Sequence, residues 1–454
     1  MNDTESISVR QAVKTAKVSS FHIYILLLCL SILIFDGFDT ALMGYVAPAI
    51  IEQWGITKAD LGLAMSAALI GLALGAIVSG PVSDRLGRKP IIVFSVIVFG
   101  VCCIATTQAI NVNQLAFWRL CTGIGIGAAM SNALTIISEF APERYKSLMV
   151  NTVFCGFPFG AALSGGLASW LIPNLGWHSV FIFGGILPLL LLIPLILTLP
   201  ESILFQLNQP GAESKIRKTV HRLLGERRVN LSVSPTPVSE SAITPIRDIL
   251  SRSMLPATVL LWLAYFMGLL IFYVVTSWMP ILMGEAGYDL QHAAFLTALF
   301  PLGGAVGTIV SGLLMDKITP HKIVAFNYLM TGLLLFSIGF LSDIYLLGLF
   351  ILLAGTVMNG AQASMGSIAT LHYPTSSRAT GVSWMLGMGR AGGIVGAMMG
   401  AWLFQFGLDY KGIFKILLIP SLFAALALLG LMLTLKWKKR RLSESALIGS
   451  EACL

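Results

Sequence analysis

GLALGAIVSGPVSDRLGRKP, at residues 71–90, is an apolar run that ends in a charged turn, and a second version of it, GGAVGTIVSGLLMDKITPHK, occupies residues 303–322. One offset of 232 residues aligns these runs and also aligns residues in the first, fourth and fifth apolar segments of each half. The aligned pairs are Pro48 with Pro280, Gly71 with Gly303, Gly75 with Gly307, Ser79 with Ser311, Gly80 with Gly312, Asp84 with Asp316, Gly123 with Gly355, Pro142 with Pro374, Gly160 with Gly392 and Trp170 with Trp402. The chain is therefore predicted to consist of two related halves.

The composition of the chain is that of an integral membrane protein. Of its 454 residues, 56% are hydrophobic and only 11% are charged, and the mean hydropathy is +0.85. A helix needs about 20 mostly apolar residues to cross a bilayer. Twelve such spans are predicted, at residues 22–46, 61–80, 91–109, 115–139, 148–171, 179–199, 256–282, 292–314, 322–341, 345–370, 379–403 and 413–435. Long continuous apolar runs favour helices over a barrel, so the predicted fold is all-α.

The basic residues predict the topology. Of the 29 Lys and Arg residues, 24 fall on one side of the predicted membrane, two fall on the other and three lie within spans. By the positive-inside rule both termini are cytoplasmic, which also accounts for the net charge of +8 without a nucleic acid partner. The predicted segments are an N-terminus (1–21), an N-terminal six-helix half (22–199), a cytoplasmic connector (200–255), a C-terminal six-helix half (256–435) and a basic cytoplasmic tail (436–454).

Each predicted half has an even number of spans, so both halves enter the membrane from the same side and are parallel. Two such bundles can rock about a site near the middle of the bilayer and expose it to each side in turn. Small residues four positions apart, as at Gly71 and Gly75, allow helices to pack closely. The duplication therefore favours a transporter.

The candidate coupling residues are five ionisable residues inside the predicted spans: Asp36, Asp39, Arg119, Glu139 and Arg390. A charge at the centre of a membrane helix costs roughly 2.5–3.5 kcal/mol on insertion scales, so each is expected to have a partner or a function. Asp36 and Asp39 are three residues apart and lie near one helix face. Two carboxylates so close resist simultaneous ionisation, so we expect the pair to carry a proton. The alternative is a salt bridge from one or both to an arginine of a neighbouring helix.

Arg390 lies near the middle of the eleventh span, in WMLGMGRAGGIVG, where glycines leave room for its side chain. Its planar guanidinium group suits bidentate contact with a carboxylate, and Trp384 is expected to supply an aromatic wall. These residues predict a site for an anionic, aromatic substrate. The alternative role for Arg390 is to balance the charge of the first-span aspartates.

Arg119 and Glu139 lie twenty residues apart in the fourth span, or about 30 Å along a helix, so they are not expected to pair. Arg119 is predicted near the outer side, where it helps to bind substrate or to couple its movement. Glu139 is predicted near the cytoplasmic end. It either takes part in proton coupling and gating or pairs locally with Arg144.

The turn GPVSDRLGRKP, at residues 80–90, resembles the signature loop of the major facilitator superfamily, and RLCTGIGIGAA, from Arg119, resembles its arginine motif. The charged residues of the turn are expected to latch neighbouring helices in one conformational state, with a tight turn at Gly87. The expected latch residues are Gly80, Asp84, Arg85, Gly87 and Arg88, with Asp316 and Lys317 in the second copy, which lacks the Gly-Arg-Lys portion. The alternative role for the turn is to anchor the helix ends at the cytoplasmic surface.

Longer stretches are similar to the aromatic acid:H⁺ symporter family, and particularly to its 4-hydroxybenzoate/protocatechuate permeases. They are DGFDTALMGYVAPAI (36–50), MSAALIGLALGAIVSGPVSDRLGRK (65–89), SEFAPERYKSLMV (138–150), GWHSVFIFGGILPLLL (176–191), LPES (199–202) and RATGVSWMLGMGRAGGIVGA (378–397). The resemblance implies import of 4-hydroxybenzoate, protocatechuate or a close relative such as vanillate or benzoate across a bacterial inner membrane. It also implies functional roles for Asp36, Asp39 and Arg390.

For such a substrate, three polar residues of the fourth and tenth spans are expected to sense ring substituents: Asn132, Asn359 and Gln362. Their alternative role is to form hydrogen bonds between helices.

No nucleotide-binding GxxxxGK[ST] loop is present, so the proton gradient rather than ATP is expected to drive transport, and no cofactor is expected. No catalytic triad or metal-ligand pattern is found, so we do not expect an enzyme or a metal site. The expected partners are the substrate, H⁺ and the lipid bilayer, without an obligatory protein partner. The alternative function is a proton-coupled sugar or other organic-anion porter of the same superfamily, because LPESILF resembles the sugar-porter pattern without its arginine.

Overall fold

The computed structural model describes residues 7–207, 209, 211–224, 231–232, 249–252, 254–315, 317–374 and 377–451. The chain folds as two compact units, Met1–Ser239 and Glu240–Leu454. The division between them falls inside the segment predicted to be a connector, residues 200–255.

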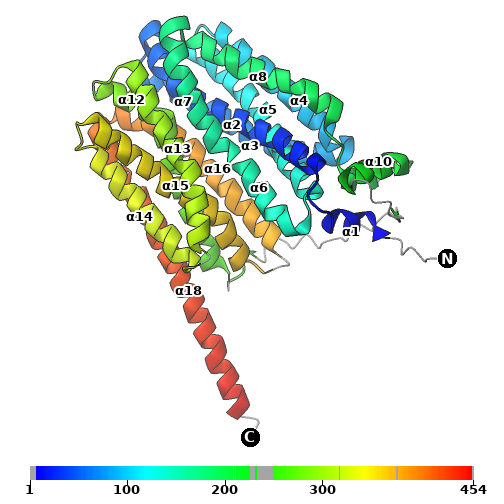
Figure 1. Cartoon of the computed structure of the whole chain (residues 1–454). Helices are drawn as coiled ribbons and strands as arrows, with labels where there is room; N and C mark the ends of the chain where they lie inside the picture. Colours follow the sequence, from blue (N-terminus) through cyan, green and yellow to red (C-terminus); the bar gives the residue numbers. More distant parts are fainter. Residues whose placement is uncertain are drawn as a thin grey trace, which may run out of the picture. The chain divides into compact units, whose positions relative to one another are not determined.

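Long helices form the first unit (Figure 1). Its helices are α1 (Val9–Lys14), α2 (Ser20–Trp54), η1 (Lys58–Leu61), α3 (Gly62–Leu86), α4 (Arg88–Ala105), η2 (Thr106–Gln108), α5 (Val112–Phe140), η3 (Glu143–Tyr145), α6 (Lys146–Phe154), α7 (Gly156–Leu175), α8 (Trp177–Thr198), α9 (Ile203–Leu207) and α10 (Glu213–Leu224). Two short strands, β1 (Ile7–Ser8) and β2 (Leu231–Ser232), pair in parallel. In the bundle α3 packs on α5, α2 packs on α7, and α4 packs on both α5 and α8.

The second unit repeats this packing. Its helices are α12 (Leu255–Glu285), α13 (Leu290–Met315), α14 (Pro320–Ile338), α15 (Ile344–His372), α16 (Arg378–Gln405), α17 (Tyr410–Ile416) and α18 (Leu418–Glu451). Here α13 packs on α15, α12 packs on α16, and α14 packs on both α15 and α18. Helix α18 continues past the predicted end of the last span, and Figure 1 shows it extending beyond the other helices of its unit.

The predicted all-α membrane fold is confirmed. In the described part of the chain, eleven helical segments are long and apolar enough to cross a membrane. The predicted span at residues 379–403 is not one of the eleven, although α16 is helical over all of it, because its glycines and Arg390 lower its apolar character. Two predicted spans are each built from two helices, with breaks at Cys155 and Leu417.

The predicted polar connector contains an amphipathic helix, α10. Its apolar residues Ile216, Val220 and Leu223 recur on one face and are buried. They belong to one core cluster with Val13 of α1 and with residues of α2 and α5. Part of this segment is therefore packed onto the first unit.

The predicted repeat is visible in the helix contacts. At four glycines of the first unit, an added methyl group would overlap a backbone carbonyl of the neighbouring helix, and the second unit repeats each contact 232 residues later. The four pairs of contacts are Gly71 to Leu120 and Gly303 to Leu352, Gly75 to Ile124 and Gly307 to Thr356, Gly123 to Ala68 and Gly355 to Phe300, and Gly160 to Ile34 and Gly392 to Phe266. These glycines let helix backbones touch, which is how membrane helices gain packing energy without a hydrophobic driving force.

One contact of the repeat has exchanged its large and small residues. In the first unit Gly127 of α5 packs against Leu72 of α3. At the equivalent place in the second unit the large residue is Asn359, on α15, and the small residue is Gly304, on α13. Asn359 therefore fills the space that a glycine on its partner helix leaves open.

The first turns of several helices are capped by acidic or amide side chains. Asn111, Asp343 and Asp409 accept hydrogen bonds from backbone N–H groups at the starts of α5, α15 and α17. Asp289 does the same for α13. The hydrogen bond that it accepts from the backbone N–H group of His292 lowers the pKa of its carboxyl group. All four caps lie in loops predicted to face away from the cytoplasm.

We expect Gly123→Ala to lower the melting temperature of the detergent-purified protein by several degrees, because its methyl group meets the Ala68 backbone carbonyl and overpacking costs about 1–3 kcal/mol. The matched control is Gly166→Ala on α7, where nothing lies within 4 Å of the new methyl group. Equal melting temperatures for the two variants would show that the close α3–α5 contact does not limit stability.

Candidate functional site

The first unit encloses a bidentate ion pair between α2 and α5. The Nη1 atom of Arg119 donates to Oδ1 of Asp39 at 2.6 Å, and its Nη2 atom donates to Oδ2 at 2.9 Å. Nη2 also donates to the backbone carbonyl of Asp39 at 3.0 Å. The two side chains are 1% and 0% exposed, so the charges are screened by little water and the attraction between them is strong.

Residues from two further helices complete the surroundings of this pair. The thiol of Cys103, on α4, lies 3.7 Å from Oδ1 of Asp39 and 3.4 Å from the carbonyl oxygen of Phe181 on α8. The Phe181 ring lies 5.8 Å from the Arg119 guanidinium carbon, which is a cation–π distance. Helices α2, α4, α5 and α8 thus meet at one buried charge pair.

Asp36 is the second buried carboxylate of α2. It is 1% exposed, and its Oδ1 atom accepts a hydrogen bond from Thr40 at 3.4 Å. It precedes Asp39 by three residues, so the two carboxylates are about 60° apart around the helix and about 4.5 Å apart along it. The salt bridge that the sequence left open as an alternative is therefore formed by Asp39. Arg119 can contact a substrate only if this bridge opens.

A second cluster joins the turn between α3 and α4 to the ends of α5 and α8. The Nε atom of Arg88 donates to Oε1 of Glu139 at 3.0 Å, and the Ser202 hydroxyl donates to Oε2 at 2.5 Å. Glu201 accepts hydrogen bonds from the backbone N–H groups of Arg88 and Ser202, both at 2.8 Å, and from that of Lys89 at 3.2 Å. The carboxylate of Glu201, which follows the end of α8, thus binds backbone N–H groups in the first turn of α4.

The expected partner of Glu139 is corrected by this cluster. Glu139 pairs with Arg88 of the charged turn, whereas the Arg144 guanidinium carbon lies 5.4 Å from the ring of Tyr145. The local pair fails because Phe140 ends α5, and Arg144 belongs to the next short helix, η3. Sequence reasoning also missed Glu201 and Ser202 as members of the site, although LPES directly follows the sixth span.

The remaining expected latch residues contribute less to this charged cluster. Gly87 has a positive φ of 97°, and an added Cβ atom there would lie 2.5 Å from Oε2 of Glu201, so this turn requires glycine. The Oδ1 atom of Asp84 lies 3.6 Å from the Nη2 atom of Arg88. Arg85 and Lys317 are exposed, and an added Cβ atom at Gly80 would have no neighbour within 4 Å. Asp316 lies outside the described residues.

In the second unit a polar cluster surrounds Gly268 of α12. The Tyr328 hydroxyl group, from α14, donates to Oε1 of Gln362 on α15 at 2.7 Å, and both atoms lie where a Cβ atom on Gly268 would be. One turn earlier on α12, the ring of Tyr265 packs against the backbone of Gly389 on α16. The next residue of α16 is Arg390, so this packing places the start of its side chain near Tyr265.

Other predicted substrate residues are placed differently. Trp384 stacks on Trp262 with ring centres 5.8 Å apart, and it is separated from Arg390 by about 9 Å along α16 and by about 120° around it. The amides of Asn132 and Asn359 donate to carbonyls of their own helices, at 2.8 and 3.0 Å. Of the three predicted polar sensors, only Gln362 belongs to the cluster around Gly268 described above.

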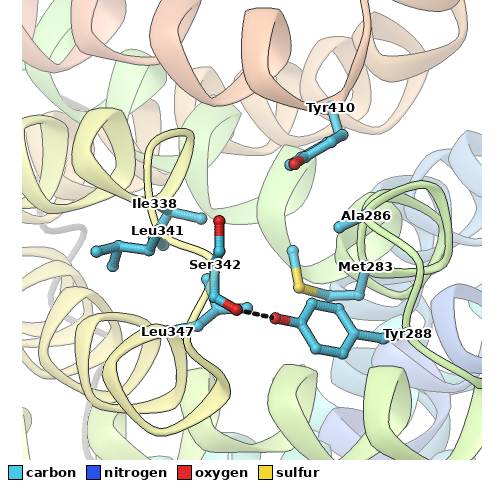
Figure 2. Close-up of a pocket in the computed structure, with 8 residues that line it drawn as sticks. All are labelled: Met283, Ala286, Tyr288, Ile338, Leu341, Ser342, Leu347 and Tyr410. Carbon is cyan, nitrogen blue, oxygen red and sulfur yellow. Dashed lines mark hydrogen bonds between the residues drawn. The ribbon is translucent and has the colours of Figure 1, made fainter.

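A small cavity of about 80 Å³ lies at the end of the second unit where α12 ends and α15 begins (Figure 2). The Tyr288 hydroxyl group donates to the carbonyl oxygen of Ser342 across it, at 3.3 Å. Burial, Tyr410 and Asp343 raise the pKa of Tyr288. None of the predicted site residues lines this cavity, so we assign it no part in the site.

The sequence matches the Major Facilitator Superfamily over residues 28–356 and 293–449. The chain belongs to this superfamily. It is 43% identical to the 4-hydroxybenzoate transporter PcaK of Pseudomonas putida over 94% of its own length and 96% of that protein. It is 41% identical to the gallate transporter of Pseudomonas putida, over 93% of this chain and 95% of the relative. The crystal structure of a D-xylose-proton symporter, 17% identical, matches it with a TM-score of 0.70 over 90% of this chain and 97% of that one.

Membership of the Major Facilitator Superfamily confirms the fold and the resemblance inferred from the sequence. The chain is a multi-pass membrane transporter, not an enzyme. Among the described residues, no group of three or more His, Cys, Asp or Glu side chains is placed to hold a metal ion.

We expect Asp39→Asn and Arg119→Gln each to reduce the yield of folded transporter sharply, because an unpaired buried charge costs about 3–5 kcal/mol. The double variant Asp39→Asn/Arg119→Gln should recover much of the yield, because neither charge remains. Size-exclusion chromatography of detergent extracts measures this yield. A double variant that is no better than the worse single variant would contradict the pairing.

We expect the changes Arg88→Gln and Glu139→Gln to be non-additive in thermal stability, with a coupling of about 0.5–3 kcal/mol, because their side chains are in contact. The matched control combines Arg144→Gln with Glu139→Gln, and these changes should add. Melting temperatures of the single and double variants supply the data for both double-mutant cycles. Coupling in the Arg144 cycle but not in the Arg88 cycle would favour the local pair that the sequence suggested.

Proposed function

We propose that the chain imports an aromatic carboxylate together with a proton, by alternating access, across the cytoplasmic membrane of a bacterium. The observation that carries this proposal is the identity of 41–43%, over nearly the whole chain, to transporters of 4-hydroxybenzoate and gallate. Both compounds are benzoates with ring hydroxyl groups. The residues of the chain itself support a role for a proton and for an anion, as follows.

The proton is proposed to bind within the cluster of Asp36, Asp39 and Arg119. When all three are ionised the cluster has one net negative charge, and one added proton makes it neutral. A net charge buried among apolar helices is costly, so protonation stabilises the closed arrangement of this unit. Both oxygens of Asp39 already accept hydrogen bonds from Arg119, so we assign the exchanging proton to Asp36. In this proposal Glu139 acts in the cytoplasmic cluster rather than in proton coupling.

The substrate carboxylate is proposed to bind Arg390, which lies near the middle of α16. Glycines on both sides of it, at 389 and 392, are packed against Tyr265 and Phe266 of α12, so the backbone around Arg390 is held firmly while its side chain is long enough to reach a ligand. A guanidinium group pairs with a carboxylate through two parallel hydrogen bonds. Tyr265 supplies the aromatic surface that the sequence assigned to Trp384.

Coupling requires that the empty, charged transporter changes state less readily than the occupied one. The proton neutralises the cluster on α2 and α5, and the substrate neutralises Arg390. Only when both are bound are the two sites neutral, which favours movement of substrate and proton together. The cluster of Arg88, Glu139 and Glu201 is proposed to latch one of the two states.

A sugar substrate is the alternative, and the structural similarity to a D-xylose-proton symporter does not favour it, because at 17% identity that similarity concerns the fold alone. Sugars are neutral and give Arg390 no charge to bind.

We expect cells that express the chain to take up radiolabelled 4-hydroxybenzoate, with competition by protocatechuate and gallate and none by glucose or xylose. A protonophore should abolish the uptake, because the gradient supplies the energy. The variant Asp36→Asn should reduce accumulation at least about tenfold while leaving exchange of internal for external substrate, since exchange needs no net proton transfer. Accumulation that persists with the protonophore, or competition by sugars instead of aromatic acids, would refute the proposed function.

A further inference from the structure

The second unit contains an amide group that is positioned for a ligand. Tyr328 holds the Oε1 end of the Gln362 amide, and the Nε2 end is buried without a hydrogen-bond partner in the described part of the chain. A buried N–H group without an acceptor is unfavourable, and a ligand oxygen that accepts its hydrogen bond removes that cost. Asn132 and Asn359, the other amides considered from the sequence, already donate to their own helices.

The surroundings keep this amide in place. Tyr328 is fully buried, and its backbone carbonyl accepts a hydrogen bond from the Ser421 hydroxyl group of α18. Gly268 lies against both Tyr328 and Gln362, and any side chain at this position would displace the amide. The Gln362 head group is thus held by α12 and α14, and α18 holds Tyr328 in turn, which is the rigid support that a selective binding group needs.

The repeat relates the position of this amide cluster in its own unit to that of the proton site in the first unit. Gly268 is the counterpart of Asp36 at the 232-residue offset, and both lie near the middle of their helices. Arg390 follows Gly389, whose backbone packs against the ring of Tyr265, and Tyr265 precedes Gly268 by three residues on α12. A cation for a carboxylate and an amide for a neutral polar group therefore belong to one cluster within the second unit.

From this geometry, and building on the proposed function, we propose that Gln362, held by Tyr328, binds a ring hydroxyl group of the substrate and makes the transporter select hydroxylated benzoates. A phenolic hydroxyl group both donates and accepts, so it satisfies the end of the amide that Tyr328 does not hold, in either of the amide's two orientations. A ring hydrogen or methyl group at the same place leaves that end unpaired. Sites built to bind a hydroxyl group reject analogues that lack it for this reason.

The test compares 4-hydroxybenzoate with 4-methylbenzoate, in which a methyl group of similar size replaces the hydroxyl group. Inhibition constants of both acids are measured against uptake of labelled 4-hydroxybenzoate in proteoliposomes. The wild-type transporter should bind the hydroxylated acid at least about tenfold more tightly. In Gln362→Met the preference should fall to about threefold or less, and the loss should affect the hydroxylated acid alone.

Two further variants keep the test decisive. Tyr328→Phe leaves the amide in place without its tether, so the preference should fall part of the way. Ser364→Ala is the matched control, because Ser364 is buried on the same helix and its hydroxyl group donates to Gly360 within that helix, so the preference should not change.

The proposal is overturned if Gln362→Met weakens both acids equally, or keeps the full preference. If this variant does not reach the membrane, an unchanged preference in Tyr328→Phe, or a wild-type preference below about twofold, overturns it in the same way. A wild-type protein that takes up no aromatic acid at all refutes the proposed function instead, so the two failures are distinguishable.

Discussion

The buried bridge between Asp39 and Arg119 is the interaction on which the first unit depends. Four helices contribute to it or to its immediate surroundings, and neither charge is accessible to solvent. Ions in such a place are tolerated only when their geometry is good, and here both Nη atoms of Arg119 and both carboxylate oxygens of Asp39 are used. The bridge therefore fixes the positions of α2 and α5 relative to each other and sets the electrostatic environment of Asp36, the neighbouring carboxylate.

The bridge is not repeated at the equivalent positions of the second unit. At the four equivalent positions it has Ile271, Ile351, Leu335 and Ile413, and all of them are fully buried apolar residues. Conversely, the cluster around Gly268 corresponds in the first unit to Leu33, Val96 and Met130, where no tyrosine or amide is found. Duplication has preserved the backbone contacts between helices while the chemistry of the two units has diverged. One unit has buried ions, and the other has a cation with neutral polar groups.

The sequence was sufficient for the fold because apolar length and the 232-residue repeat are properties of the chain alone. It also identified Asp36, Asp39 and Arg390 as unusual, because a charge within an apolar run is costly wherever it lies. It was insufficient for their partners. Whether Asp39 meets Arg119, or Glu139 meets Arg88 rather than Arg144, depends on which helix faces pack together. Likewise, the sequence predicts a substrate role for Asn359 but does not show that its amide packs against Gly304 and donates to the carbonyl of Gly355.

The carboxylate of Glu201 has a mechanical consequence. It follows the last long helix of the first unit and binds backbone N–H groups at the start of α4, while its neighbour Ser202 binds Glu139 at the end of α5. The connector between the units therefore begins at a point that is tied to three helices, and further along it α10 packs onto the same unit. A pull on the chain beyond α10 is shared among several helices, so it moves the bundle as a body rather than unwinding the end of a single helix.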